Sequence, residues 1–451
     1  MADRHRLGPG QHPGIHLHTL MSLHEFADRL RSPDDRRAFL EKAAKMAFGL
    51  TVLPAFAAAA EPSAPKAPNA SLPGFGKAKS IIFLELSGGM SHIDTFDPKT
   101  GASKGPGDAV TTKAGYQVTS LLPATARVSD KLCVIRSMTA KVGVHASAQY
   151  LMRTGFEQRG VIQHPNFGAW AQHFLGRSSQ TLPASVCVNR PSNQGNGWFP
   201  ASHAPLPILD PANGLPNTSG VGDSNDQKKR AALLGELDRG FGGVVGDQNV
   251  KAYNDFYAST FELMRSRDLK AFDISAEPKA ARAKYGADKF AQGCLLARRL
   301  VEHGVRFVEV RSGGWDMHAS LEDRMEDIGA EFDAAFAALI EDLDSKGMLD
   351  TTLVVVTTEF GRKPSFEGGG RGHHPLVFST VLAGAGVRRG HVHGASDPKG
   401  YEVAKDPVTA GAFHATVAHA AGLPVGTEIM TPSGRPMVIG NKAAPVTAVF
   451  A

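Results

Sequence analysis

The chain has only three cysteines, Cys133, Cys187 and Cys294, and they form neither a CxxC pair nor a zinc-finger pattern. A zinc-finger site built from thiolates is therefore excluded. Cys294 lies within an apolar pattern of helical period and is expected to be a small buried side chain. A disulfide between Cys133 and Cys187 is compatible with an oxidising compartment, but sequence alone does not set the geometry that the bond requires. That pairing stays an open alternative.

Aromatic residues make up only 7% of the chain, and no stripe of Lys and Arg interleaved with aromatics occurs. The net charge of +5 results from 49 basic and 44 acidic residues, so neither sign dominates. Nucleic acid is therefore not an expected partner. With 42% hydrophobic and 21% charged residues over 451 positions, the composition is that of an ordinary globular protein with a large core.

No apolar run is long enough to predict a transmembrane helix in the mature chain. The best N-terminal candidate, residues 43–60, is short, is interrupted by Lys45 and ends in four alanines. It follows residues 35–40, whose sequence Asp-Arg-Arg-Ala-Phe-Leu resembles a twin-arginine export signal, and small residues suit signal-peptidase cleavage. We therefore expect export to the periplasm or the extracellular space. A cytosolic amphipathic helix is the alternative, and Met21 is an alternative start that would give a signal of normal length.

Composition divides the chain into three expected regions. Residues 1–60 form an N-terminal extension that carries the signal, and residues 61–76 form a tether rich in Pro, Ala and Ser. Residues 77–451 form a single domain. An irregular insertion near 195–250, rich in Gly, Pro, Asn and Ser, interrupts that domain.

Short continuous apolar runs predict strands that are buried on both faces, as in a parallel sheet. These runs cover residues 80–86, 131–136, 184–188, 305–310, 352–357 and 377–383. Apolar positions at helical spacing predict helices at 286–303 and 320–346, with others near 227–241, 251–268 and 407–421. Because strands and helices alternate, we expect an α/β fold: a doubly wound, mainly parallel sheet with helices on both faces.

Four clusters of polar side chains lie next to the ends of strands in this predicted sheet. Ligands of such sheets bind outside the carboxyl ends of the strands, so side chains there are the first candidates for a site. Asp316 and His318 lie two residues apart, and on an extended segment that spacing points both to one face. Glu359 leaves the tip of a buried strand, where an unpaired charge would be costly. The candidate metal ligands are Asp316, His318, Glu359, His373, His374, His92 and Asp94.

Carboxylate oxygens and imidazole nitrogens together suit a divalent ion, for which zinc is the expected cofactor and calcium, magnesium and manganese are alternatives. Each residue also has a structural alternative. A lone histidine is more often hydrogen-bonded in a core or at a surface, and Glu359 and Arg362 could pair as a salt bridge. The grouping of the four clusters predicts a metal or anion site.

The motifs also occur in a characteristic order. After the twin-arginine signal come residues 88–99, then 145–155, then 313–318 and 359–362, and finally His373. In this order they resemble the domain-of-unknown-function 1501 family, which is common in planctomycetes and related bacteria, over nearly the whole mature chain. That family belongs with the alkaline-phosphatase and sulfatase superfamily. The resemblance implies an alkaline-phosphatase-like, doubly wound α/β fold with a metal site.

The resemblance also implies roles for single residues. Ser147, at the start of an expected helix, would be the nucleophile, with His145 or Arg362 near the leaving or transferred group. A helix N-terminus would stabilise an anion at that point. Asp316, His318, Glu359 and His373 would hold the divalent ion.

Three positions depart from the pattern that the resemblance implies. Ser87 stands where the superfamily has a metal-binding acid, and Phe360 stands where it has a histidine. Gly372 stands where the family commonly has an aspartate. Each position lacks a side chain that the superfamily uses.

Two functions are therefore carried forward. The first is an exported metal-dependent hydrolase of a phosphate or sulfate ester, acting on a small molecule or a polysaccharide, in which the metal is a Lewis acid. The second is an exported binding or structural protein that keeps the fold without turnover. Divalent metal content together with turnover of generic aryl esters discriminates between them.

Overall fold

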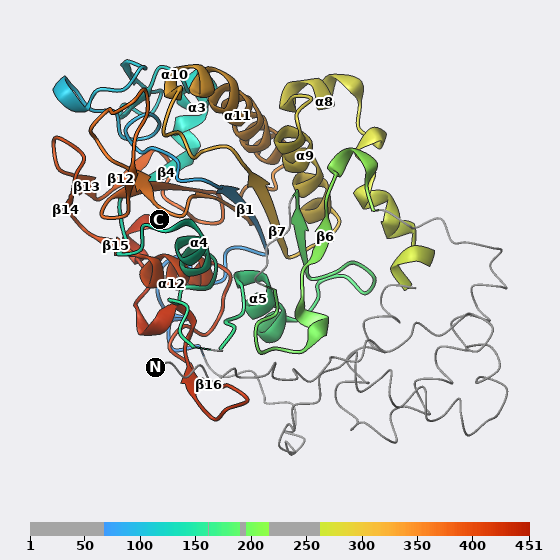
Figure 1. Cartoon of the computed structure of the whole chain (residues 1–451). Coiled ribbons are helices and arrows are strands. Elements are labelled where there is room, and N and C mark those ends of the chain that lie inside the picture. Colours follow the sequence, from blue (N-terminus) through green and yellow to red (C-terminus); the bar gives the residue numbers. More distant parts are fainter. Residues whose placement is uncertain (1–66, 161, 190–194, 216–261) are drawn as a thin grey trace, which may run out of the picture. The chain divides into compact units, whose positions relative to one another are not determined.

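A computed structural model describes residues 67–160, 162–189, 195–215 and 262–451 of the chain (Figure 1). The chain divides into two units, Met1–Ser63 and Ala64–Ala451, and the first lies wholly outside the described residues. The export signal, the helix expected near 227–241 and most of the one expected near 251–268 also lie outside them. Among the described ranges, no helix combines the length and apolar character that crossing a bilayer requires.

In the part of the second unit that the structure describes, a nine-stranded sheet forms the centre. All neighbouring strands run parallel except β11, which is antiparallel to both β8 and β4. The order across the sheet is β12 (His391–His393), β4 (Leu132–Thr139), β11 (Phe378–Ala383), β8 (Thr352–Thr357), β1 (Ser80–Leu86), β7 (Phe307–Ser312), β5 (Ser185–Val188) and β6 (Leu206–Ile208), with β15 (Val408–Thr409) also paired to β4.

Helices cover both faces of the sheet. One face carries α3 (Pro123–Val128), α8 (Lys279–Tyr285), α9 (Lys289–Glu302), α10 (Leu321–Arg324) and α11 (Ala330–Ser345). The other carries α4 (His145–Thr154), α5 (Phe167–Leu175) and α12 (Ala410–Ala420). This arrangement confirms the predicted α/β class, a doubly wound, mainly parallel sheet.

Within the described ranges, four two-stranded ribbons lie outside the main sheet. Only one of them, the ribbon that joins β8 to β11, bears on the site described below. The ribbons are β2–β3 (Ala109–Thr111, Gln117–Thr119), β9–β10 (Gly361–Arg362, His373–His374), β13–β14 (Ala395–Ser396, Val403–Lys405) and β16–β17 (Ile429–Met430, Pro436–Met437).

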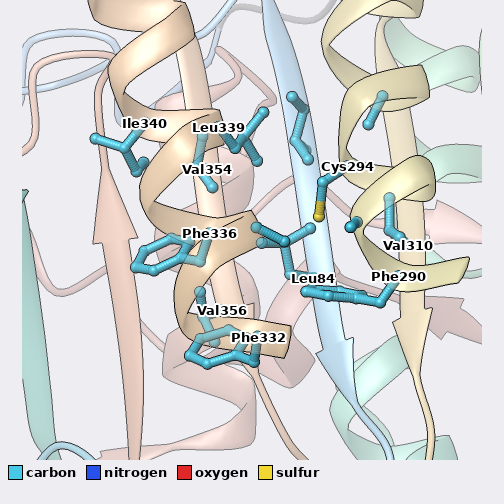
Figure 2. Close-up of a cluster of buried hydrophobic side chains, with 14 of the residues drawn as sticks. Leu84, Phe290, Cys294, Val310, Phe332, Phe336, Leu339, Ile340, Val354 and Val356 are labelled. Carbon is cyan, nitrogen blue, oxygen red and sulfur yellow. The ribbon is translucent and has the colours of Figure 1, made fainter. Parts of the chain in front are cut away.

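Side chains alternate between the two faces along β1, which is why a continuous apolar run was needed there. Leu84 packs in the core under α9 and α11, while Phe83 packs on the side of α5 and α12. Figure 2 shows the first of these cores, in which Phe332 and Phe336 of α11 lie over the strands and their rings stack with centroids 5.4 Å apart. Truncating such a buried phenylalanine to alanine costs about 3–5 kcal/mol.

Two expectations about local structure need correction. The helix predicted over 320–346 is divided by a π-helical turn at Met325–Gly329, between α10 and α11. The Cys133–Cys187 disulfide is wrong, because the two cysteines, both buried, are not bonded to each other. Cys133 lies in β4 and Cys187 in β5, and four strands separate β4 from β5. At about 4.8 Å per strand, that spacing is far beyond the reach of a disulfide.

Candidate metal centre

The site lies at the carboxyl ends of the central strands β1, β7 and β8. Ser87 follows β1, Asp316 follows β7, and Glu359 follows β8. Parallel strands direct the segments after them to one edge of the sheet, so loops that are distant in sequence meet there. The N-terminus of α4 and the β9–β10 ribbon complete the site.

Asp316 is the centre of a cluster of potential metal ligands. Its Oδ2 lies 3.3 Å from Nε2 of His145, and its Oδ1 lies 3.4 Å from Nε2 of His373. One ligand atom from each of these three residues lies within 4.8 Å of the others. The cluster therefore brings together three segments: the start of α4, the loop after β7, and β10.

His318 lies at the open side of this cluster. Its Nε2 is 3.1 Å from Oδ1 of Asp316 and 3.0 Å from Nε2 of His373. Ligand atoms that share one tetrahedral ion with bonds of about 2.0–2.1 Å lie about 3.4 Å apart. The separations around Asp316 are close to that value, so His145, Asp316 and His373 could supply part of one coordination shell, with His318 beside them.

Glu359 does not face the cluster but contacts it through His145. Its side chain is fully buried, and both carboxylate oxygens accept from the backbone N–H of Gly88 at 3.0 Å. Its Oε1 also lies 2.6 Å from Nδ1 of His145. Since a carboxylate accepts at Nδ1, the other ring nitrogen is left free for a metal. Accordingly, Nε2 of His145 is buried and has no hydrogen-bond partner among the described residues.

Arg362 is committed entirely to the protein. Its Nε donates to Gly89 O at 2.9 Å, and its Nη1 donates to Arg371 O at 2.9 Å and faces Nε2 of His318 at 3.4 Å. Its Nη2 donates to Gly88 O and to Oδ1 of Asp316. A guanidinium has five N–H groups, so none remains for a substrate. Arg362 therefore positions Asp316 and has no N–H group left to donate to a bound substrate.

The charge states of the cluster suit metal binding. Burial raises the pKa of Asp316, but the hydrogen bond and charge of Arg362 outweigh it, and the net shift is downward. Burial lowers the pKa of His373, aided by the charge of Arg362 and opposed by its hydrogen bond to Gly143 O. An ionised carboxylate and a neutral imidazole are the forms that bind a divalent ion.

The ribbon explains which of two adjacent histidines joins the cluster. His373 pairs across the ribbon with Arg362, and His374 pairs with Gly361. Successive side chains of a strand point to opposite faces, so His374 is directed away from Asp316. Its Nε2 instead lies 2.6 Å from Tyr401 O.

Two further candidates, His92 and Asp94, also lie outside the cluster. His92 is fully buried with its Nε2 3.0 Å from Gly400 O, and burial lowers its pKa to about 4. Asp94 is paired with Arg371, whose Nε lies 2.7 Å from its Oδ2, and both side chains are fully buried. Neither is near enough to His145, Asp316 and His373 to join their ligand group.

Ser147, the expected nucleophile, lies in the first turn of α4 but not on the face that meets the cluster. Two residues of an α-helix correspond to a rotation of about 200°, and four to about 40°. His145 and Gln149 therefore share the face toward Glu359, while Ser147 lies on the opposite side of the helix. The structure brings His145, Asp316, His318, Glu359, His373 and Arg362 together and leaves out Ser147, His92, Asp94 and His374.

Gln149 and Arg311 were not foreseen from the sequence. Gln149 Nε2 donates to Ser87 Oγ at 3.1 Å and lies 3.4 Å from Oε1 of Glu359. Arg311 Nη2 donates to the same serine oxygen at 3.2 Å. Its position four residues after His145 was the available signal for Gln149, because residues four apart share one helix face.

A buried ion network anchors α4 under the site. Arg153 of α4 bonds Glu85 of β1 at 2.9 Å and also pairs with Glu309 of β7, and Arg311 lies 2.9 Å from Glu85. Removing one partner from such a network leaves an uncompensated buried charge. The network thus ties the helix that carries His145 to the two strands next to it.

Comparisons with known proteins identify one family. The model of the family described as "Protein of unknown function (DUF1501)" matches residues 78–450. No curated protein is similar enough in sequence to match the chain.

Several solved structures resemble the fold at low identity. A structure of Ps i-CgsB in complex with k-i-k-neocarrahexaose is 12% identical, with a TM-score of 0.38, over 76% of this chain and 71% of that one. The PsFucS1 sulfatase from Pseudoalteromonas sp. is 11% identical, with a TM-score of 0.35, over 87% and 72%. Alkaline phosphatase from the Antarctic bacterium TAB5 is 12% identical, with a TM-score of 0.31, over 70% and 94%.

Proposed function

The chain belongs to the DUF1501 family of proteins of unknown function, and we propose that it is a metal-dependent hydrolase of a phosphate or sulfate ester. One observation carries the proposal: His145, Asp316 and His373 offer ligand atoms within 4.8 Å of one another at the carboxyl edge of a parallel sheet. Ligand sites of such folds lie at this edge.

The residues present fit a divalent ion. The unpartnered, buried Nε2 of His145 is directed at Asp316, and Glu359 holds the ring from its other nitrogen. This is the carboxylate–histidine arrangement that orients metal ligands in proteins. Imidazole donors favour zinc over the harder calcium, magnesium and manganese, so zinc is the ion that we propose.

When bound, the ion would supply Lewis-acid stabilisation of the charge that develops on the ester oxygens. The protein's own part is to hold the ligands in place. Arg362 fixes Asp316, Glu359 fixes His145, and the Gly143 carbonyl contacts Nδ1 of His373 at 2.9 Å. Asp316 and His318 have side chains that are 44% and 54% exposed, so an ester would approach from their side of the cluster.

Metal content and turnover test this function together. We expect the purified chain to carry about one equivalent of divalent metal and to hydrolyse p-nitrophenyl phosphate or p-nitrophenyl sulfate. The variants Asp316→Asn and His373→Ala should lose both properties. His374→Asn is the matched control, since His374 lies next to His373 but contacts Tyr401 O instead. Purified protein with neither metal nor turnover would refute the proposal.

A non-catalytic binding or structural role remains the second candidate. It is favoured by the placement of Ser147 away from the cluster and by the full commitment of Arg362 to protein acceptors. Metal bound in stoichiometric amount, with no turnover of aryl esters or of phosphorylated and sulfated saccharides, would support this role over the hydrolase.

Export through the twin-arginine route is part of the same proposal, since Arg36 and Arg37 stand in a sequence that resembles its signal. The substrate would then be a small-molecule or polysaccharide ester outside the cytoplasm. Replacing both arginines by lysine should retain the chain in the cytoplasm on cell fractionation. An unchanged periplasmic or extracellular fraction would remove this part of the proposal and leave the metal site untouched.

A further inference from the structure

A cavity of about 560 Å³ lies at the opposite end of α4 from the metal centre. Its walls come from the end of β4, the end of α4, the start of α12 and residues 435–443. Helices α4 and α12 are neighbours in Figure 1. Gly155 follows His145 by ten positions, which corresponds to about 15 Å along the helix, so the end of α4 that borders the cavity is remote from His145.

The lining of this cavity is cationic. Lys141, Arg159 and Arg435 are set against a single carboxylate, Glu157. Arg159 already pairs with Glu157 at 2.9 Å. In the described part of the chain, neither Lys141 nor Arg435 forms an ion pair, so their charges remain available to a ligand. The floor includes apolar side chains, namely Leu151, Phe156 and Met437.

His164 adds a buried hydrogen-bonding group to the wall. Only 5% of the residue is exposed, and its ring stacks on Phe156 with centroids 4.4 Å apart. Its Nδ1 lies 2.6 Å from the Tyr150 hydroxyl, and its Nε2 has no partner among the residues that the structure describes. Burial, then the charge of Arg435, lowers its pKa to about 4. The Tyr150 hydroxyl has one hydrogen, and Nδ1 at 2.6 Å is a much closer acceptor for it than the Ile162 carbonyl at 3.5 Å. Nε2 of the neutral ring then carries the hydrogen and can donate into the cavity.

The geometry points to a second binding site: we propose that this cavity binds the phosphate or sulfate group of an organic anion whose apolar part rests on Leu151 and Phe156. Lys141 and Arg435 neutralise the charge, and His164 donates to an oxygen of the ligand. The N-terminus of α12, which begins at Ala410 after its N-cap Thr409, adds a partial positive charge to the same wall. No step of catalysis is needed for this binding.

Calorimetric titration of the full chain with phenyl phosphate tests the site. In Asp316→Asn, whose metal centre should not turn phenyl phosphate over, we expect one binding event, and it should weaken at least tenfold when Lys141→Gln and Arg435→Gln are added to that variant. Both residues are exposed, so the double variant should fold, and its melting temperature should be that of the parent. Lys405→Gln is the matched control, because it removes an exposed cation of β14 outside the cavity and should leave the affinity unchanged.

Three results would overturn the inference. Phenol binding as tightly as phenyl phosphate would show that the anionic group is not recognised. An unchanged affinity in the double variant would exclude the two cations. Loss of all binding in Asp316→Asn would assign the ligand to the metal cluster. Because the titration reads binding and not turnover, a chain that hydrolyses nothing could still confirm the cavity, and an active chain could still fail here.

Discussion

Two aspartate–arginine pairs lie near the carboxyl edge of the sheet, and they differ in what remains unsatisfied around them. In the Asp94–Arg371 pair, both side chains are fully buried, and Ser91 Oγ donates to Asp94 Oδ2 at 2.5 Å. In the Asp316–Arg362 pair, the arginine is buried but 44% of the aspartate side chain is exposed, with three imidazoles around it. The Asp94–Arg371 pair is buried and engaged within the protein, whereas ligand atoms around Asp316 are still available to a metal ion.

The type of a residue does not by itself determine whether its side chain is available to bind a ligand. Both pairs sit in motifs rich in Gly, His and Asp, and both looked like metal-ligand motifs in the sequence. A buried carboxylate that is fully hydrogen-bonded contributes to folding, whereas one that keeps a free lone pair beside imidazole side chains can bind a cation. We therefore expect stability to depend on the Asp94–Arg371 pair and metal binding to depend on the Asp316–Arg362 pair.

The largest effect, on the free energy of unfolding, should come from removing the carboxylate of the buried Asp94–Arg371 pair. Asp94→Ala leaves the charge of Arg371 buried without its carboxylate, and we expect a loss of about 3–5 kcal/mol in the free energy of unfolding. Asp316→Ala should cost only about 1 kcal/mol, because that carboxylate is partly exposed and Arg362 keeps its carbonyl acceptors. Urea unfolding monitored by circular dichroism measures both. Equal losses in the two variants would erase the distinction.

The buried region should also be the acid-sensitive one. His92, on the same loop as Asp94, is fully buried and its pKa is lowered to about 4, against about 6.5 when unfolded. Between these values the unfolded chain binds the proton and the folded chain does not, so stability falls as pH drops from 6.5 toward 4. For this group the loss is about 3 kcal/mol. His92→Gln should flatten that part of the pH–stability curve, as followed by urea unfolding at pH 7, 6 and 5, and a curve of unchanged slope would contradict it.

A smaller effect, on zinc affinity, is expected when Glu359, which holds His145 beside Asp316, is changed. Glu359→Gln keeps the shape of the side chain but no longer fixes the Nδ1 proton of His145, so zinc affinity should fall about 10- to 100-fold with every ligand still present. Competition with a chromogenic chelator measures that affinity. Gln149→Leu, which removes a weaker contact to the same carboxylate at 3.4 Å, should change it less. If the two variants weaken binding alike, Glu359 has no special role in orienting the histidine.

Much of the fold and part of the site could be predicted because they depend on local pattern. The runs at 80–86 and 352–357 are strands with those bounds, since a strand buried on both faces must be apolar at every position. Asp316, His318, Glu359 and His373 were expected together on the ground that strand ends share an edge. The structure places Asp316, His318 and His373 in contact and joins Glu359 to them through His145, and their role as ligands stays a prediction that metal analysis tests.

The rest depended on partners that are distant in sequence. Nothing in the loop at 91–94 indicates that Arg371 will neutralise Asp94, because that contact joins residues 277 positions apart. The choice between His373 and His374 required the register of the β9–β10 ribbon. The placement of Ser147 required the helical phase that His145 sets once it contacts Glu359. In each case the missing information was a direction in space, which residue type and spacing alone do not contain.

Strand β11 runs antiparallel to its neighbours, and for that reason the site can contain residues that follow one strand and residues that precede another. Asp316 and Glu359 follow β7 and β8, whereas His373 precedes β11. Had β11 run parallel to its neighbours, its amino end would lie at the opposite edge, about 20 Å away for six residues, and His373 with it. One reversal in direction therefore lets consecutive segments, Glu359 to His374, leave the sheet and return at the same edge as a short hairpin. The two halves of the centre can then be changed independently, by altering a loop after a strand or the ribbon before one, without disturbing the order of the sheet.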